Sequence, residues 1–241
     1  MSERVAVVTG ANRGIGLHLV DQLQHRGWRV VAGCRHPDDA GMLYALRPMA
    51  LLALDVSDPV SVSHFRDELR THAEHVDLIV NNAGVMSAAG GRVGEASAAD
   101  QAVNGPLAAL DGEQIDRVMS VNATGPLLVT QALASMLRPG AAVVNVSSRL
   151  GSLSLATASS YGYSMSKAAL NMATTILARE LGPHGVVCVA VSPGWVRTDM
   201  GGDDARLDPR EATSGMADLI GRLHPADNGT FIDYLGEQIP W

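Results

Sequence analysis

The amino-acid sequence predicts an α/β fold, in which a doubly wound parallel sheet of seven strands is flanked by helices on both faces. Two observations lead to this prediction. Short apolar, β-branched runs recur along the chain, and segments with apolar residues at helical spacing separate them. The chain has 241 residues, of which 46% are hydrophobic, so we expect residues 1–241 to form a single domain.

The first unit of the chain combines a strand, a glycine-rich turn and a helix. Residues 4–9 form an apolar run typical of a buried parallel strand, residues 10–16 form the turn, and residues 17–26 have helical periodicity. Gly27 stands where a helix commonly ends. Glycines in such a turn let the backbone approach a pyrophosphate, which the following helix N-terminus attracts. The unit therefore predicts a dinucleotide site, and the alternative is a glycine-rich turn without a ligand.

The remaining strands and helices follow from the same alternation. Pro59 and Pro209 fit the first position of a helix, and Asp111 with Gln114 resembles a capping box at the start of another. We expect helices to begin at these three places and to include residues 111–137 and 161–181. Further strands are predicted over residues 28–34, 49–54, 76–80, 141–146, 186–191 and 230–234.

Two segments show neither the apolar pattern of a strand nor the apolar spacing of a helix. Residues 85–110 are rich in Gly, Ala and Ser and predict a long loop insertion. This insertion is either a lid or pocket wall beside the ligand, or a surface insertion without a role. Residues 200–215 begin with a glycine- and aspartate-rich stretch and predict a movable substrate loop.

A tyrosine and a lysine on one predicted helix indicate proton-transfer chemistry. Tyr163 and Lys167 are four residues apart, which places them on the same helix face. A phenol keeps its proton up to a pH of about 10, and we expect the adjacent ammonium to lower that pKa. Tyr163 could then exchange a proton near neutral pH while Ser148 holds a substrate oxygen. Tyr161 is six residues before Lys167 and faces elsewhere, so Tyr163 is the predicted proton-transfer residue.

Taken together, these motifs resemble the short-chain dehydrogenase/reductase family, whose members have a single-domain Rossmann fold. The resemblance rests on Gly10, Gly14 and Gly16 in the turn, Asn81-Asn82-Ala83-Gly84 after the fourth strand, Asn122, Ser148, Tyr163 with Lys167, and Pro193-Gly194. The chain ending, from Asp233 to Trp241, is similar to that of the C-factor and Sniffer-like carbonyl reductases.

The resemblance also implies the residues of the active site. Its catalytic set would be Asn122, Ser148, Tyr163 and Lys167, with Asn122 in a local helix distortion whose freed carbonyl holds a water near Lys167. The substrate would contact Ser148, Tyr163 and Trp195. The implied dinucleotide-binding residues are Gly10, Asn12, Arg13, Gly14, Ile15, Gly16, Arg35, Asp55, Val56, Asn82, Ala83, Gly84, Val121, Tyr163, Lys167, Pro193, Gly194, Val196 and Thr198.

The expected cofactor is NADP(H), preferred over NAD(H). An NAD site needs a carboxylate at the end of the second strand for the ribose 2′-OH, but Cys34 stands there and Arg35 follows. A guanidinium binds a 2′-phosphate in bidentate fashion. Arg13 falls where NADP-preferring members of the family carry a second basic residue. The alternative is that both arginines are solvated, and the nearby Asp38 and Asp39 leave an incomplete preference open.

The composition argues against several other classes of protein. The net charge is −7 and the arginines are scattered, which disfavours nucleic-acid binding. We find no apolar run long enough to span a membrane and no signal peptide, so the cytoplasm is the expected location. Cys34 and Cys188 are too few for a disulfide framework. His72 and His75 lack nearby cysteine and carboxylate partners, so no metal is expected.

The predicted function is NADPH-dependent reduction of a small aldehyde or ketone to an alcohol, or the reverse reaction. Two alternatives remain: a dinucleotide-binding signalling protein of the C-factor type, and an alcohol dehydrogenase of a biosynthetic pathway. The resemblance also implies a homodimer or homotetramer, in which the two helices containing Asn122 and Tyr163 pair with those of a second subunit.

Overall fold

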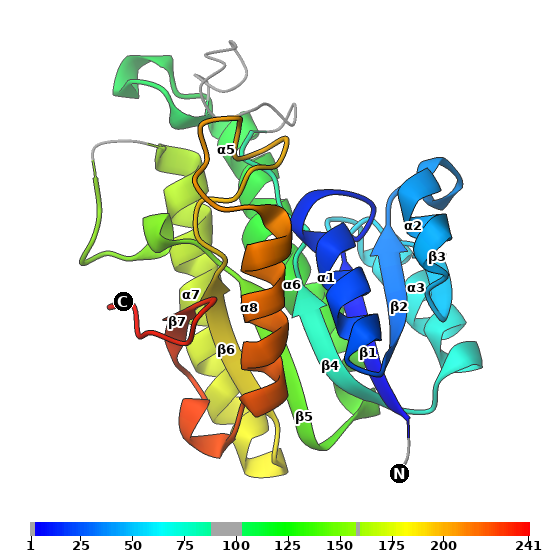
Figure 1. Ribbon diagram of the computed structural model, residues 1–241. Coiled ribbons are helices and arrows are strands. Elements are labelled where there is room, and N and C mark those ends of the chain that lie inside the picture. The colour runs from blue at the N-terminus through cyan, green and yellow to red at the C-terminus, as the bar shows by residue number, and fades with distance from the viewer. Residues whose placement is uncertain (1–2, 88–102, 158–159) are drawn as a thin grey trace.

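The structure, a computed structural model, describes residues 3–87, 103–157 and 160–241. Its centre is one sheet of seven strands, all parallel, in the order β3-β2-β1-β4-β5-β6-β7. Figure 1 shows this order from β3 at the right to β7 at the left. The α/β fold predicted from the sequence is therefore confirmed. The strands are β1 (Arg4–Thr9), β2 (Trp28–Cys34), β3 (Ala50–Ala53), β4 (Val76–Asn81), β5 (Leu137–Val146), β6 (Val187–Ser192) and β7 (Phe231–Asp233).

Helices cover both faces of the sheet, so its central strands are buried on both sides. Every residue of β4 and β6 is buried, which explains why most of their residues are apolar. One core lies beneath α1 (Gly14–His25), α2 (Gly41–Leu46) and α8 (Pro209–Arg222). The other lies beneath α3 (Pro59–His72), α6 (Gly125–Leu133) and α7 (Tyr161–Leu181).

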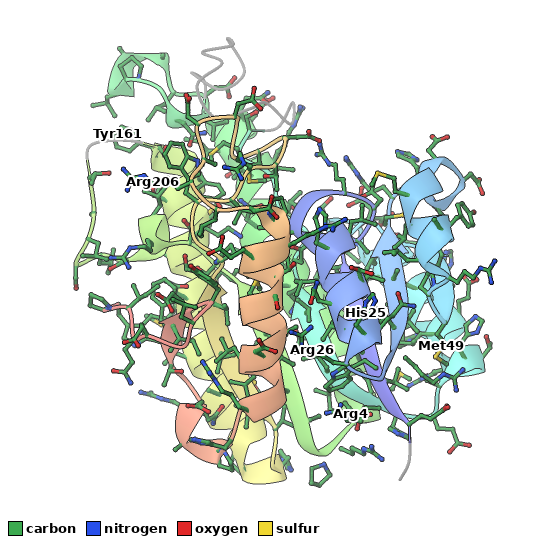
Figure 2. All side chains as sticks on the ribbon, in the orientation of Figure 1. Arg4, His25, Arg26, Met49, Tyr161 and Arg206 are labelled. Carbon is green, nitrogen blue, oxygen red and sulfur yellow. The ribbon has the colours of Figure 1, made fainter. Side chains whose placement is uncertain are left out.

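The strand order reverses between β1 and β4, and this reversal decides where a ligand can bind. Because all strands run in one direction, their carboxyl ends meet at one end of the molecule. Figure 2 shows Tyr161 and Arg206 at that end, while Arg4, at the start of β1, lies at the other. Open α/β sheets bind ligands in the crevice at such a reversal.

The expected helix over residues 111–137 is interrupted. It consists of α5 (Gly112–Met119), a π-helical turn (Ser120–Thr124) and α6, and β5 begins at Leu137 rather than at residue 141. Pro126 in the first turn of α6 cannot donate a backbone hydrogen bond, and Gly125 N–H reaches back to Ser120 C=O. The helix distortion expected around Asn122 is therefore present, while the predicted helix end is wrong.

Other boundaries differ from the predictions in smaller ways. Asp111 caps α5, but its side chain accepts from Glu113 N–H, so the expected pairing with Gln114 is not the bond observed. Helix α8 begins at Pro209 as predicted, with Asp208 as its cap, so only residues 200–208 of the predicted substrate loop of residues 200–215 precede the helix. Helix α2 was not predicted from the sequence. Most of the predicted insertion, residues 88–102, lies outside the described residues.

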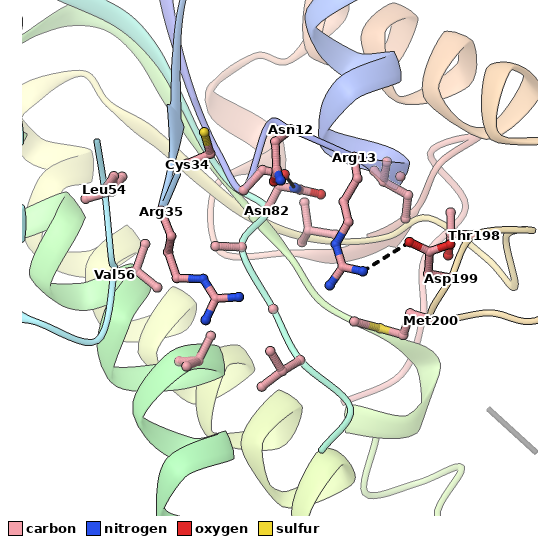
Figure 3. A pocket seen from close by; sticks show the side chains of 18 of the residues that line it. Asn12, Arg13, Cys34, Arg35, Leu54, Val56, Asn82, Thr198, Asp199 and Met200 are labelled. Carbon is pink, nitrogen blue, oxygen red and sulfur yellow. Dashed lines mark hydrogen bonds and ion pairs between the residues drawn. The ribbon is translucent and has the colours of Figure 1, made fainter. Parts of the chain in front are cut away.

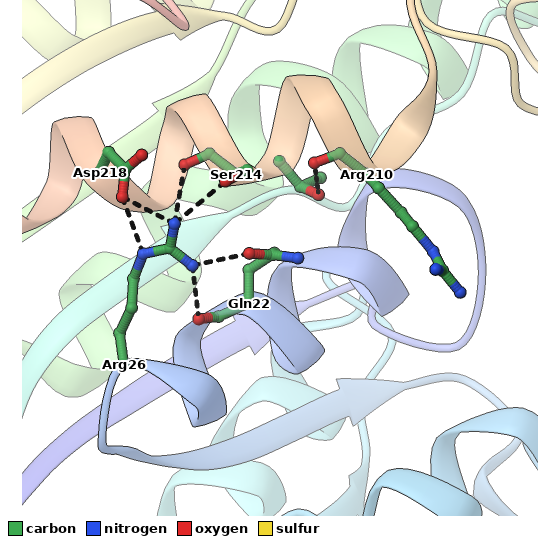
Figure 4. Close-up of polar contacts among 6 residues, drawn as sticks. Gln22, Arg26, Arg210, Ser214 and Asp218 are labelled. Carbon is green, nitrogen blue, oxygen red and sulfur yellow. Dashed lines mark hydrogen bonds and ion pairs between the residues drawn. The ribbon is translucent and has the colours of Figure 1, made fainter.

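Arg26 joins the end of α1 to α8. Its guanidinium donates to Asp218 at 2.6 and 2.9 Å, to the hydroxyl of Ser214 at 3.1 Å and to the amide oxygen of Gln22 at 2.6 Å (Figure 4). These contacts hold two helices that cover the same face of the sheet. No helix in the described part of the chain has both the length and the apolar character needed to cross a lipid bilayer.

Candidate active site

The glycine-rich turn lies at the sheet reversal and opens one end of a long cleft. A Cβ atom on Gly16 would collide with the carbonyl oxygen of Gly10, so the tight turn requires glycine at this position. Helix α1 begins at Gly14, and its N-cap residue, Arg13, makes no side-chain capping bond. The first N–H groups of α1 are thus left for an anion such as a pyrophosphate.

Two arginines border this cleft, and they differ in their partners. Figure 3 shows Arg35 beside the end of β2 and Arg13 beside the glycine turn. The guanidinium of Arg13 pairs with Asp199 at 3.0 Å, and both side chains are more than half exposed. Arg35 makes no ion pair with any residue in the three described segments. The ion pair between Arg13 and Asp199 was not predicted from the sequence.

The cleft collects most of the residues predicted to bind a dinucleotide. Those that line it are Gly10, Asn12, Arg13, Gly14, Ile15, Arg35, Asp55, Val56, Asn82, Ala83, Gly84, Val121, Tyr163, Lys167, Pro193 and Thr198. Three predicted residues lie elsewhere. Gly16 packs beneath the turn, whereas Gly194 and Val196 line a neighbouring cavity. Cys34 lines the cleft at the place where an NAD site would present a carboxylate.

The neighbouring cavity has a volume of 510 Å³ and contains the residues predicted to bind a substrate. Ser148, Tyr163 and Trp195 all line it, together with Met86 and Asn104 from the region of the predicted insertion. Tyr163 lines both the cleft and the cavity, as do Ile15, Ser147, Pro193, Thr198 and Met200. A ligand in the cleft and a ligand in the cavity would therefore meet beside Tyr163.

The four residues predicted to be catalytic are close together. Tyr163 and Ser148 line the same cavity, and hydrogen bonding by Ser148 favours the phenolate form of Tyr163. The ammonium of Lys167 lies 5.7 Å from the centre of the Tyr163 ring and donates to the carbonyl of Val146 at 2.8 Å. Asn122 is fully buried and exchanges two hydrogen bonds, each 2.8 Å long, with the backbone of Val85.

The predicted effect of Lys167 on the tyrosine is not what the structure shows. Burial raises the pKa of Tyr163 to about 12, and only the hydrogen bond with Ser148 opposes this rise. Burial also lowers the pKa of Lys167 to about 8. The expected lowering of the phenol pKa by the ammonium is therefore corrected. Removing either charged form from water costs more than their mutual attraction returns at this separation.

Residues 4–207 match the short chain dehydrogenase family. The chain belongs to the short-chain dehydrogenase family. As a member of that family it is an oxidoreductase, which agrees with a cleft at the sheet reversal lined by Tyr163 and Lys167.

Proteins similar to this short-chain dehydrogenase include one named C-signal and several carbonyl reductases. The C-signal of Myxococcus xanthus is 43% identical over 169 residues, which are 69% of this chain and 93% of that protein. The carbonyl reductase Sniffer of D. melanogaster superposes with a TM-score of 0.87 at 28% identity, over the whole of both chains. An NADPH-bound carbonyl reductase from chicken fatty liver gives a TM-score of 0.83 at 31% identity, also over both whole chains.

In this short-chain dehydrogenase, sequence reasoning missed a buried polar pair that supports Ser148. The hydroxyl of Ser147 donates to the amide oxygen of Asn171 at 2.6 Å, and the nitrogen of Asn171 donates to the carbonyl of Gly151 at 3.1 Å. The pair holds the turn of residues 148–151 against α7. The spacing of Asn171, four residues after Lys167, was the signal that could have revealed it, because both lie on one helix face.

Proposed function

We propose that this protein is an NADP(H)-dependent carbonyl reductase that converts a small aldehyde or ketone to an alcohol. The observation that carries the proposal is the position of Tyr163, which lines both the cleft and the cavity and shares the cavity with Ser148. A proton donor and a second hydroxyl donor thus meet where a cofactor and a substrate would meet. The similarity to carbonyl reductases supports the same reaction.

The residues of the cleft fit a dinucleotide with a 2′-phosphate. The uncapped N-terminus of α1 would hold the pyrophosphate, Arg35 and Arg13 the 2′-phosphate, and Asp55 and Val56 the adenine. Cys34, in place of a carboxylate, puts no negative charge against that phosphate. When bound, the reduced nicotinamide supplies a hydride to the carbonyl carbon of the substrate. The remaining cofactor contacts are proposed for Asn82, Ala83, Gly84, Val121, Lys167, Pro193, Val196 and Thr198.

The hydroxyl groups of Ser148 and Tyr163 perform the proton chemistry of the proposed reaction. Both donate hydrogen bonds to the carbonyl oxygen, and they stabilise the negative charge that develops on it. Tyr163 then gives its proton to that oxygen. Its raised pKa keeps the phenol protonated at neutral pH, which is the form that reduction requires. Lys167 and Asn122 lie behind Tyr163 and are proposed to return a proton to it through water.

The proposal is tested by following the loss of NADPH absorbance with an aromatic aldehyde, an aliphatic ketone and a 1,2-dione, and by repeating each assay with NADH. We expect Tyr163→Phe to lower kcat by at least about 100-fold, because the proton donor is lost, while the Kd for NADPH changes little. Tyr161→Phe is the control, since Tyr161 is 43% exposed at the start of the same helix. A Tyr163→Phe variant that keeps most of its activity would refute the role of this residue.

The 43% identity to the C-signal supports a second candidate function, a dinucleotide-binding signalling protein that needs no turnover. This function does not require Ser148 or Tyr163 to face the cavity. Binding of NADPH without its oxidation by any member of the carbonyl panel would favour it. The reverse reaction, alcohol oxidation, requires Tyr163 to lose its proton, and the raised pKa of the phenol disfavours that step at neutral pH.

A further inference from the structure

Asn104 contacts two segments that are far apart in the sequence. Its side-chain nitrogen donates to the carbonyl of Met86 at 2.9 Å. Its side-chain oxygen accepts a hydrogen bond from the backbone N–H of Tyr163 at 3.1 Å, across 59 residues of the chain. One amide group thus bridges the segment that follows β4 and the first turn of α7.

The first turn of α7 needs such a partner, because the residue before the helix does not supply one. The N-cap residue, Ser160, has a left-handed backbone with φ of 58° and makes no side-chain capping bond. The first N–H groups of a helix have no partner within the helix. The oxygen of Asn104 therefore does for Tyr163 what an N-cap side chain normally does.

Packing around Val103 strengthens this contact. Val103 is fully buried, and a Cβ atom on Gly162 would collide with its side chain and approach its carbonyl oxygen to 3.1 Å. Glycine at residue 162 lets the backbone around Val103 and Asn104 lie directly against the first turn of α7. The small size of Gly162 and the burial of Val103 therefore allow close packing between these two segments.

The segment after β4 that Asn104 contacts is also bound by Asn122. The backbone N–H and carbonyl of Val85 both bond to the side chain of Asn122, and the carbonyl of the next residue, Met86, bonds to Asn104. Asn122 also donates to the hydroxyl of Ser166 on α7 at 3.0 Å. Two asparagines therefore connect the segment after β4 to the helix that carries Tyr163, one at Tyr163 itself and the other at Ser166.

We propose that Asn104 is a positioning residue, which fixes the first turn of α7 and with it the hydroxyl of Tyr163 relative to Ser148. The inference rests on the proposed carbonyl reductase function and deepens it, because it assigns a positioning role to a residue within the predicted insertion. Asn104 also lines the 510 Å³ cavity in which a substrate would sit. Small displacements of a proton donor away from the reacting atom strongly lower the rate of the catalysed step.

The test uses three variants of the full chain. Asn104→Ala removes both hydrogen bonds, while Asn104→Asp keeps an oxygen that can accept from Tyr163 N–H. Asn228→Ala is the matched control at the other end of α7. There the side chain of Asn228 accepts from Cys188 N–H at 2.8 Å and donates to the carbonyl of Ala178 at 2.8 Å, so the same two kinds of bond are lost far from the active site.

Two readouts are measured for each variant: amide hydrogen exchange in the first turn of α7, and kcat and KM with the best substrate of the carbonyl panel. We expect Asn104→Ala to speed exchange of the Tyr163 amide by about fivefold or more and to lower kcat by about 10- to 100-fold. The Kd for NADPH should stay within about twofold. Asn104→Asp should restore most of both losses, and Asn228→Ala should change neither.

Several results would overturn the inference. They are unchanged exchange in Asn104→Ala, unchanged kcat despite faster exchange, an equal loss of kcat in Asn228→Ala, or no recovery in Asn104→Asp. If the wild-type protein reduces no member of the panel, the proposed function fails. The exchange of the Tyr163 amide alone then decides whether Asn104 holds the first turn of α7.

Discussion

Burial, more than charge, controls the two ionisable side chains at the centre of the active site. Tyr163 and Lys167 are both enclosed, and the same loss of solvent moves their pKa values in opposite directions. The phenol keeps its proton more firmly, and the ammonium loses its proton more readily. At neutral pH the phenol of Tyr163 is therefore protonated. The buried ammonium of Lys167 has a pKa of about 8, which is close to neutral pH.

The buried charge of Lys167 should cost stability in a way that depends on pH. The unfolded chain keeps this lysine protonated up to a pH of about 10.5, whereas the folded protein releases the proton near pH 8. Between these values the unfolded state binds the extra proton, so the stability of the wild-type protein rises with pH. We expect Lys167→Met to be more stable than wild type at pH 7, on the order of 3 kcal/mol, and to lose this advantage between pH 8 and 10.5.

Urea unfolding at pH 7, 8, 9 and 10 measures this difference. The lost hydrogen bond to the carbonyl of Val146 lowers the size of the advantage, so its change with pH is the informative quantity. A difference that does not change with pH would contradict the prediction.

The two arginines at the cleft should contribute unequally to cofactor choice. Arg35 makes no ion pair within the described residues, whereas Arg13 must leave Asp199 before it can bind a phosphate. An exposed ion pair of this kind contributes about 0–1 kcal/mol. Breaking it therefore offsets part of the binding free energy that Arg13 contributes when it contacts a phosphate. We expect Arg35→Asp to lower the affinity for NADPH relative to NADH by at least about tenfold, and Arg13→Ala to lower it less.

Fluorescence titration of each variant with NADPH and NADH measures these affinities. Arg29→Ala is the control, because Arg29 lies on β2, the strand that Arg35 follows, and pairs with Glu3 at 2.6 Å. An unchanged ratio of the two Kd values in Arg35→Asp would remove the physical basis for NADP(H) preference.

At the scale of elements, hydrogen bonds between side chains and backbone hold the helices in place over the sheet. Arg26 is the strongest example, because its planar guanidinium satisfies Asp218, Ser214 and Gln22 at once. All of these partners lie on α1 and α8, which cover one face of the sheet. The contact thus links two helices whose sequences are nearly 200 residues apart.

We expect Arg26→Ala to lower the free energy of unfolding by about 1–2 kcal/mol, since several charge-assisted hydrogen bonds are lost together. Arg29→Ala, which breaks one exposed ion pair with Glu3, should cost less than about 1 kcal/mol. Thermal and urea unfolding measure both values. Equal losses in the two variants would mean that Arg26 acts only as one more surface ion pair.

At the scale of the whole molecule, one helix face indicates a second subunit. Met165, Met172 and Ile176 are each at least 50% exposed on α7, and they share one face of the helix. Between residues 161 and 178 the only charged side chain is Lys167, which is buried. A long uncharged face of this kind is typical of an interface between identical subunits.

We therefore expect a homodimer or homotetramer that buries this face of α7. Met172→Glu with Ile176→Glu should shift the protein to a monomer, because two charges would be buried against their copies. Sedimentation velocity measures the oligomeric state. Val60→Glu, an equally exposed apolar position on α3, is the control and should change nothing. A wild-type protein that is monomeric at micromolar concentration would contradict the prediction.

The local sequence signals predicted the strands and the candidate site well. The apolar runs marked all seven strands, and the motifs at Gly10, Asn82, Ser148 and Tyr163 follow strands or begin helices whose ends meet at one edge of the sheet. Boundaries were predicted less well where backbone partners come from elsewhere in the chain. The π-helical turn before Pro126 and the early start of β5 are examples, since apolar spacing alone continues through both.

The sequence by itself determined the fold class, the family and the identity of the residues around Tyr163, because these depend on residue types and spacings within short segments. The tertiary structure decided three other properties. It raised the pKa of Tyr163 through burial, it paired Arg13 with Asp199, and it placed Asn104 at the start of α7. Each depends on solvent exclusion or on contact between segments 59 or more residues apart, and local spacing carries no information about either.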